Sequence, residues 1–160
     1  MLAFDKIRER GYKRIGFAGY WDKARMFGAG FHWSQGELSL EARVPPFLFS
    51  KQTPEQNQQP QFEQWLKNAN PDAILTGSLA ALVMLDKAGY RVPEDIGLAA
   101  TNVRDMPVDA GIDQNPEEIG RVSALAVISL IHDNDFGKPK FTRQILVQGE
   151  WVDGKSLPIR

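Results

Sequence analysis

The stretch KAGYRVPEDIGLAATN, Lys87–Asn102, contains the pattern that decides the fold. A helical segment ends at Gly89, a proline-containing turn follows, and a short apolar run occupies Ile96–Thr101. An apolar run of this length after a turn is typical of a buried strand. Thr101 and Asn102 break the apolar pattern at the carboxyl end of that strand, which is where parallel sheets present side chains to ligands.

The same alternation of helical and apolar segments extends along the chain. Asn115 can cap the longest helix, Pro116 suits its first position, and Glu117 suits the positive end of its dipole. Repeated strand–helix–strand units predict an α/β fold with a parallel sheet covered by helices. We expect strands at residues 14–19, 43–49, 72–77 and 96–101, helices at 2–10, 24–35, 62–71, 79–89 and 115–134, and an extended segment at 141–157.

The composition is that of one soluble globular domain and excludes several functions. The 160 residues are 42% hydrophobic and 24% charged, and they include no cysteine, which excludes disulfides, thiol nucleophiles and thiolate metal sites. The formal charge of -1 and the pI near 6.1 argue against a DNA-binding surface on this chain. No apolar run approaches the ~20 residues that cross a bilayer, and the first residues lack an export-signal pattern. We therefore expect a cytoplasmic protein without membrane contact.

Motifs for catalysis are missing from the sequence. It contains no GxSxG elbow, no phosphate-binding Gly-Lys-Ser/Thr loop, no HExxH and no GxGxxG fingerprint. His32 and His132, the two histidines, fall on separate predicted helices. We expect no catalytic residues, no metal site and no cofactor. A small α/β enzyme stays as a third interpretation, which a detected turnover would support.

Five phrases of the sequence occur in the order found in LacI/GalR-type (lactose-repressor-like) regulators. GYRVPEDIGLA is the most specific piece, and the loop at 50–61 lies outside the match. The chain therefore resembles this family along most of its length. The phrases are RGYKRIGFAG (10–19), PDAILTGS (71–78), AGYRVPEDIGLAATN (88–102), IDQNPEEIGRVS (112–123) and RQILVQGEWVDGKSL (143–157).

The resemblance implies a periplasmic-binding-protein-like fold, in which two subdomains joined by three crossovers surround a small effector. Residues 15–108 and 141–150 would form the carboxyl subdomain, a parallel-sheet sandwich. The helices at 1–10 and 115–134 would belong to an incomplete N-terminal subdomain. The helix-turn-helix domain that binds operator DNA in the family is expected to lie outside this chain. Since the family dimerises through its carboxyl subdomain, a homodimer is expected.

Two effector contacts follow from the family pattern after the fourth strand and before the long helix. The family's aromatic-Asp-Asp step falls on residues 101–103, so Asn102 replaces the first aspartate. An amide both donates and accepts hydrogen bonds, so Asn102 would bind effector hydroxyls without a charge. Gln114 matches the family glutamine before the long helix. The alternatives are a turn-forming asparagine and a solvated loop amide.

Four further candidates depart from the family pattern or add to it. Phe27 takes the place of the family arginine. Arg25 lies two residues earlier and is a candidate contact; alternatively, Arg25 is a surface arginine at the start of a helix. Ser78 stands where the family has Asn-Asp, and it suits a helix cap as well as a ligand contact. Trp21 can stack on a sugar face or serve ordinary packing.

The sequence thus predicts the effector-sensing segment of a LacI-type transcriptional regulator. A small molecule, a sugar or a sugar derivative, would bind in the cleft between the subdomains and modulate operator binding. The alternative is a sugar-binding protein of a transport system with the same fold. A helix-turn-helix upstream would indicate the regulator, and an export signal would indicate the transport protein.

Overall fold

The computed structural model describes residues 2–138 and 141–160, apart from the side chains of residues 21–26 and 55–56. The chain divides into two compact units by its internal contacts. Unit 1 comprises residues 1–112 and 151–160, and unit 2 comprises residues 113–150. Each unit is described by itself below.

A sheet with strand order β2-β1-β3-β4-β5-β6 forms the centre of unit 1. The pairs β1–β2, β1–β3, β3–β4 and β4–β5 are all parallel. This arrangement confirms the predicted α/β fold and places the carboxyl ends of β1, β3 and β4 at one edge of the sheet. The strands are β1 (Ile15–Tyr20), β2 (Phe47–Phe49), β3 (Ala73–Thr76), β4 (Gly97–Ala100), β5 (Gly111–Asp113) and β6 (Glu150–Val152).

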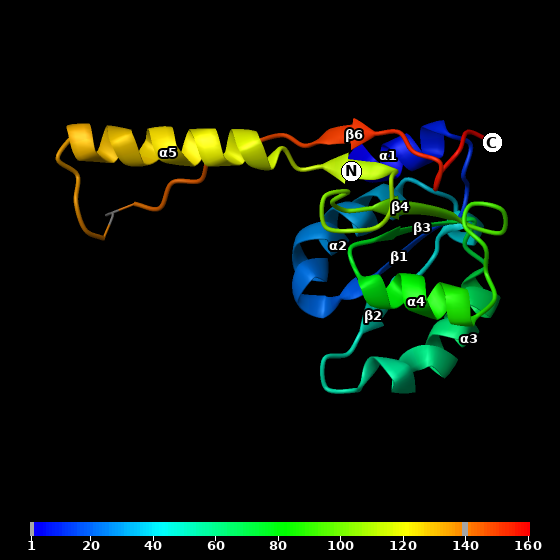
Figure 1. Ribbon diagram of the computed structural model, residues 1–160. Coiled ribbons are helices and arrows are strands. Elements are labelled where there is room, and N and C mark those ends of the chain that lie inside the picture. Colours follow the sequence, from blue (N-terminus) through cyan, green and yellow to red (C-terminus); the bar gives the residue numbers. More distant parts are fainter. Residues whose placement is uncertain (1, 139–140) are drawn as a thin grey trace. The chain divides into compact units, whose positions relative to one another are not determined.

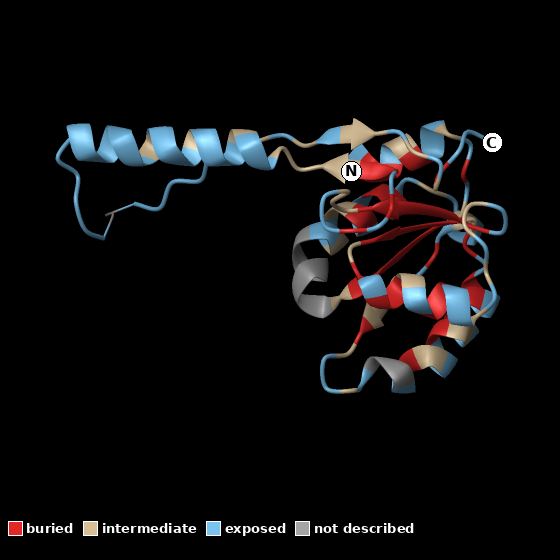
Figure 2. Ribbon diagram, viewed as in Figure 1, coloured by how far each residue is buried: buried red, intermediate tan, exposed pale blue. Residues whose placement is uncertain are grey.

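Helices cover both faces of this sheet (Figure 1). Helices α3 and α4 pack on the face that contains Ile74 and Leu98, and helices α1 and α2 pack on the face that contains Phe17 and Leu75. Both faces of β3 are therefore buried, which explains its continuous apolar sequence (Figure 2). The helical segments of unit 1 are α1 (Leu2–Glu9), α2 (Trp21–Gly36), η1 (Leu40–Ala42), η2 (Glu55–Gln58), α3 (Gln59–Ala69) and α4 (Leu79–Lys87).

Unit 2 contains one helix, α5 (Pro116–His132), within its described residues. Pro116, Glu117 and Glu118 occupy its first turn, as the sequence predicts. Asn115 stands at the predicted cap position, but its side chain makes no capping bond. Its amide nitrogen instead donates to the carbonyl oxygen of Gln148 at 2.9 Å, so the expected cap contact is replaced by one to a distant segment of unit 2.

Helix α1, which the family resemblance groups with α5 in one subdomain, packs on the sheet of unit 1: its Phe4 and Ile7 are buried in the same cluster as Phe17. One other segment differs from its expected secondary structure. The segment expected to be extended at 141–157 forms a strand only at Glu150–Val152. Residues 142–149 adopt no regular secondary structure, although the alternation around Ile145 favoured a strand.

Candidate functional site

The strand order creates a crevice at the carboxyl edge of the sheet. β1 lies between β2 on one side and β3 on the other, so the chain leaving β1 and the chain leaving β3 diverge to opposite faces. Such a topological switch point leaves room for a ligand outside the carboxyl ends of the two strands. Ligand contacts were expected at this edge, and the sheet has the topology required for them.

Hydrogen bonds hold the ends of β1, β3 and β4 together. The buried hydroxyl of Thr76 donates to the carbonyl oxygen of Ala18 at 2.7 Å and accepts from the backbone N–H of Ser78 at 3.1 Å. The backbone N–H of Thr101 donates to the carbonyl oxygen of Thr76 at 2.8 Å. Each strand end is therefore fixed relative to its neighbours, which gives a site at this edge a rigid support.

Gly77 has a steric role at the same edge. A Cβ atom added to Gly77 would lie 2.3 Å from Oγ1 of Thr101, so only glycine allows the loops after β3 and β4 to approach this closely. The sequence did not indicate that Gly77 and Thr101 are in contact. The contact depends on the register of β3 and β4, which no local pattern reveals.

A small hollow of about 10 Å³ opens between these strand ends. That volume holds about one water molecule, so it accommodates a single small group rather than a whole sugar. Most of its lining side chains are aromatic, and Thr101 contributes a hydroxyl. The residues around it are Phe17, Gly19, Tyr20, Phe27, Gly77 and Thr101.

Three of the predicted site residues lie at or beside this hollow. Phe27 lines it and is 37% exposed. Ser78 follows Gly77, is buried, and stands at the N-cap of α4 without a side-chain capping bond, so the predicted cap position is right while the capping contact is not made. Asn102 follows Thr101 and is half-buried.

The Asn102 side chain makes the contacts of a turn-forming asparagine. Its Oδ1 accepts from the backbone N–H of Arg104 at 3.2 Å, and its Nδ2 donates to Oδ2 of Asp105 at 2.7 Å. An amide oxygen accepts two bonds and an amide nitrogen donates two, so one lone pair and one N–H of Asn102 stay available. The turn contacts thus leave Asn102 able to bind a ligand.

The other three predicted residues cannot be placed at this edge. The side chains of Trp21 and Arg25 lie outside the described residues. Gln114 is half-buried within unit 2, and the strand ends belong to unit 1. The sequence did not single out Phe17 and Gly19 as site residues. Their period-two spacing on β1 is the signal that could have indicated them.

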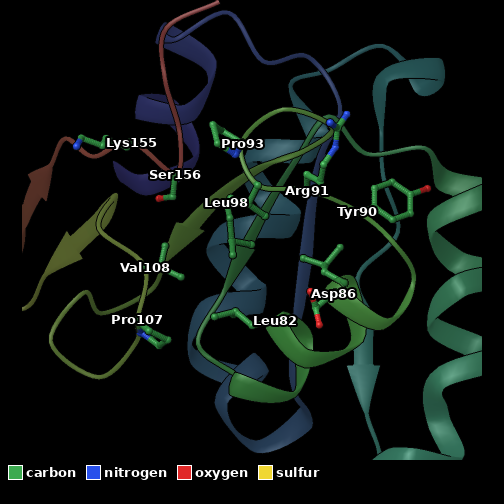
Figure 3. A pocket seen from close by; sticks show the side chains of 12 residues that line it. Leu82, Asp86, Tyr90, Arg91, Pro93, Leu98, Pro107, Val108, Lys155 and Ser156 are labelled. Carbon is green, nitrogen blue, oxygen red and sulfur yellow. The ribbon is translucent and has the colours of Figure 1, made fainter.

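A larger hollow of about 490 Å³ lies elsewhere in unit 1, between α4, the turn after it and the start of β4 (Figure 3). Leu82, Leu98 and Val108 form its apolar middle, and the polar ends of Tyr90 and Lys155 point away from it (Figure 3). Small-molecule sites usually combine an apolar lining with converging polar groups. The strand ends therefore remain the better candidate for a small polar ligand, although their hollow is smaller.

One ion pair lies at the rim of the larger hollow. Nε and Nη2 of Arg91 donate to the two carboxylate oxygens of Asp95 at 2.8 and 2.9 Å. The hydrogen bonds from the Arg91 side chain and backbone lower the pKa of Asp95 to about 2. This pair links the two ends of the turn between α4 and β4, which is a scaffold role, as expected for this turn.

Other kinds of site find no support in the described residues. They contain no group of three or more His, Asp or Glu side chains placed to hold a metal ion. None of their helices combines the length and the apolarity needed to cross a membrane.

Solved structures with a similar fold include several transcriptional regulators. A LacI family transcriptional regulator from Bifidobacterium animalis subsp. lactis matches 97% of this chain and 59% of its own, with a TM-score of 0.70 and 19% identity. A LacI-family regulatory protein from Corynebacterium glutamicum matches 99% of this chain and 64% of its own, with a TM-score of 0.64 and 17% identity. A LacI family regulator from Enterococcus faecium, solved with bound ribose, matches 99% of this chain and 62% of its own, with a TM-score of 0.66 and 16% identity.

These similarities confirm, at the level of the fold, the resemblance that the sequence phrases indicated. The chain spans about 60% of the length of the three solved structures. Comparison with curated proteins finds no match. The profile of the periplasmic binding protein-like domain matches residues 4–157, nearly the whole chain, and the protein therefore belongs to the periplasmic binding protein-like domain family.

Proposed function

We propose that this chain is the effector-sensing part of a LacI-type transcriptional regulator, and that its effector is a sugar or a sugar derivative. The observation that carries the proposal is the switch point between β1 and β3, with an aromatic hollow and a hydroxyl at its strand ends. The similar fold of several LacI-family regulators supports the regulatory part of the proposal. The ribose bound by the Enterococcus faecium regulator supports the effector class.

Each proposed contact has a distinct chemical task. Asn102 exchanges hydrogen bonds with effector hydroxyls through its remaining N–H and lone pair. Phe27, and Trp21 six positions before it, offer apolar ring faces to the C–H groups of a sugar. Ser78 supplies a hydroxyl at the start of α4. Arg25 and Gln114 are further proposed contacts.

Isothermal titration calorimetry of the purified chain tests the effector claim. The panel contains neutral pentoses and hexoses together with derivatives. We expect one of them to bind. Asn102→Ala should weaken that binding about tenfold, because an effector hydroxyl buried without its hydrogen-bond partner costs about 1–3 kcal/mol. The variant Asn68→Ala, on the outer surface of α3, serves as the matched control. Absence of binding by every member of the panel would remove the sensory claim.

The regulatory claim needs a separate measurement, made on the protein carrying its DNA-binding region. In the proposed mechanism, the effector binds one arrangement of the two subdomains more tightly and so changes the affinity for operator DNA. Saturating effector should change that affinity by about 5- to 150-fold. Tight sugar binding without any change in DNA affinity would instead favour the transport protein.

Homodimerisation is part of the same proposal, and the larger hollow marks the face that it would use. Leu79 and Val83 on the outer side of α4 are 56% and 52% exposed, beside the apolar middle formed by Leu82. Contiguous exposed apolar side chains of this kind are typical of protein interfaces. Light scattering at micromolar concentration should report a dimer, and Val83→Asp should shift it towards the monomer. A wild-type monomer would contradict this part of the proposal.

A further inference from the structure

The loop after β4 contains a carboxylate that faces the proposed effector contact. Asp105 lies three residues beyond Asn102, is exposed, and accepts a hydrogen bond from the Asn102 amide nitrogen at 2.7 Å. The backbone N–H of Asp105 donates in turn to the carbonyl oxygen of Asn102 at 3.3 Å. Two contacts therefore fix Asp105 relative to Asn102.

These contacts determine which way the Asn102 amide faces. A carboxylate can only accept a hydrogen bond, so the atom next to Asp105 must be the amide nitrogen. A backbone N–H can only donate, so the atom next to the N–H of Arg104 must be the amide oxygen. Rotation of the amide by 180° would turn both attractive contacts into repulsive ones. The remaining N–H and lone pair of Asn102 consequently have fixed directions.

The backbone on both sides of Asn102 is fixed as well. The N–H of Thr101 donates to Thr76 at the end of β3, and the N–H of Val103 donates to the carbonyl oxygen of Ile112 at 2.8 Å. Asn102 thus sits between two anchored residues, and its side chain is oriented from within the loop. An orientation set in this way does not require the ligand to be present.

The charge of Asp105 limits which ligand atoms suit Asn102. An atom that accepts from the remaining N–H would lie about 5 Å from the Asp105 carboxylate, since two hydrogen bonds of normal length meet at one nitrogen. A hydroxyl oxygen is neutral and tolerates this neighbour. A phosphate or carboxylate oxygen would be repelled by it.

We infer that Asp105 is a positioning and specificity-determining residue that orients the Asn102 amide for neutral hydroxyl groups and disfavours phosphorylated or carboxylated effectors. This inference rests on the proposed function, because it assumes that Asn102 contacts the effector. It narrows the effector class to uncharged polyols and sugars.

Matched pairs of a sugar and its phosphate ester test the inference: ribose with ribose 5-phosphate, and glucose with glucose 6-phosphate. Calorimetry gives the ratio of affinities within each pair for the wild type, Asp105→Asn and Asp105→Glu. The wild type should favour the neutral sugar. Asp105→Asn keeps an acceptor beside Asn102 but removes the charge, so the ratio should fall about tenfold while the affinity for the neutral sugar changes less than about threefold. Asp105→Glu keeps the charge and should keep the ratio.

Glu37→Gln is the matched control, because it removes one exposed carboxylate at the C-cap of α2 rather than in the loop after β4. Its ratio should equal that of the wild type. An unchanged ratio in Asp105→Asn, or tighter wild-type binding of the phosphate ester, would overturn the inference and leave the proposed function intact. Failure of the wild type to bind either member of both pairs would overturn the inference, whereas the proposed sugar effector falls only if the whole panel of sugars and derivatives fails to bind.

Discussion

Isoleucines in the two units have opposite surroundings. Ile74 in β3 is fully buried between α3, α4 and the neighbouring strands, whereas Ile128 on α5 is 49% exposed. Both hydrophobic clusters consist of unit 1 residues, and no residue of α5 is buried. A single helix of 17 residues is only marginally stable in water without packing partners. An apolar pattern can therefore specify a helix without supplying the packing that stabilises it.

The largest expected difference between the units concerns truncation of these two isoleucines. Ile74→Ala should lower the free energy of unfolding by about 2–5 kcal/mol, because it leaves a cavity between packed layers. Ile128→Ala should change it by less than about 0.5 kcal/mol, because its side chain is already solvated. Urea denaturation followed by circular dichroism measures both. Equal losses in the two variants would mean that α5 is covered in solution.

Glycine-to-alanine substitutions in the two units should change the stability by intermediate amounts and with opposite sign. Gly77→Ala places a Cβ against Thr101 in unit 1 and should cost about 1–3 kcal/mol of stability. Combining it with Thr101→Ala removes the colliding hydroxyl and should restore most of the loss. Both effects are measured by thermal unfolding, and the absence of any rescue would show that the collision is not the cause.

Gly120→Ala is the corresponding change in unit 2, where a new Cβ meets no atom within 4 Å. It should stabilise α5 by about 1 kcal/mol, since alanine has the higher helix propensity. Slower amide hydrogen exchange in α5 would report the gain. Destabilisation by Gly120→Ala would contradict the open surroundings of this helix.

The same contrast explains which parts of the fold were predictable from the sequence. Strands β1, β3 and β4 end within one or two residues of their predicted bounds, because both of their faces are buried and their sequences are continuously apolar. β5 has only three residues and no such signal. Its start at Gly111 depends on a close approach to the backbone of Ala100, where a Cβ would lie 2.2 Å from the carbonyl oxygen.

Long-range contacts also decided which site residues could be predicted. Asn102 and Ser78 could be proposed as contacts from the sequence, because each follows an apolar run at a strand end; their binding role stays a prediction. The orientation of Asn102 by Asp105 was local but depended on the loop conformation, and the contact of Gly77 with Thr101 depended on the pairing of two strands. The cap predicted at Asn115 was not made, because its amide contacts Gln148, 33 positions away.

The smallest expected effects come from one carboxylate in each unit. Asp109 of unit 1 accepts from the backbone N–H groups of Ser156 and Lys155, at 2.9 and 2.8 Å, and so fastens the C-terminal segment to the loop before β5. The bond from Ser156 is the main cause that lowers the pKa of Asp109 below its ordinary value. Glu118 of unit 2 has its pKa lowered chiefly by a side-chain bond from Arg121, on the same exposed helix.

A lowered pKa in the folded state means that the folded protein binds the proton less readily than the unfolded chain. The stabilisation from Asp109 is therefore fully present above the ordinary aspartate pKa and is lost as the pH falls through the lowered value.

Asp109→Asn should cost about 1 kcal/mol at pH 7, after allowance for solvent exposure. The difference from the wild type should shrink as the pH is lowered below about 4. Glu118→Gln should leave the unfolding curve unchanged at pH 7 and below pH 4, because Glu118 and Arg121 form an exposed ion pair, which contributes little to stability. A pH-independent cost of Asp109→Asn would show that the substitution acts through shape rather than through charge.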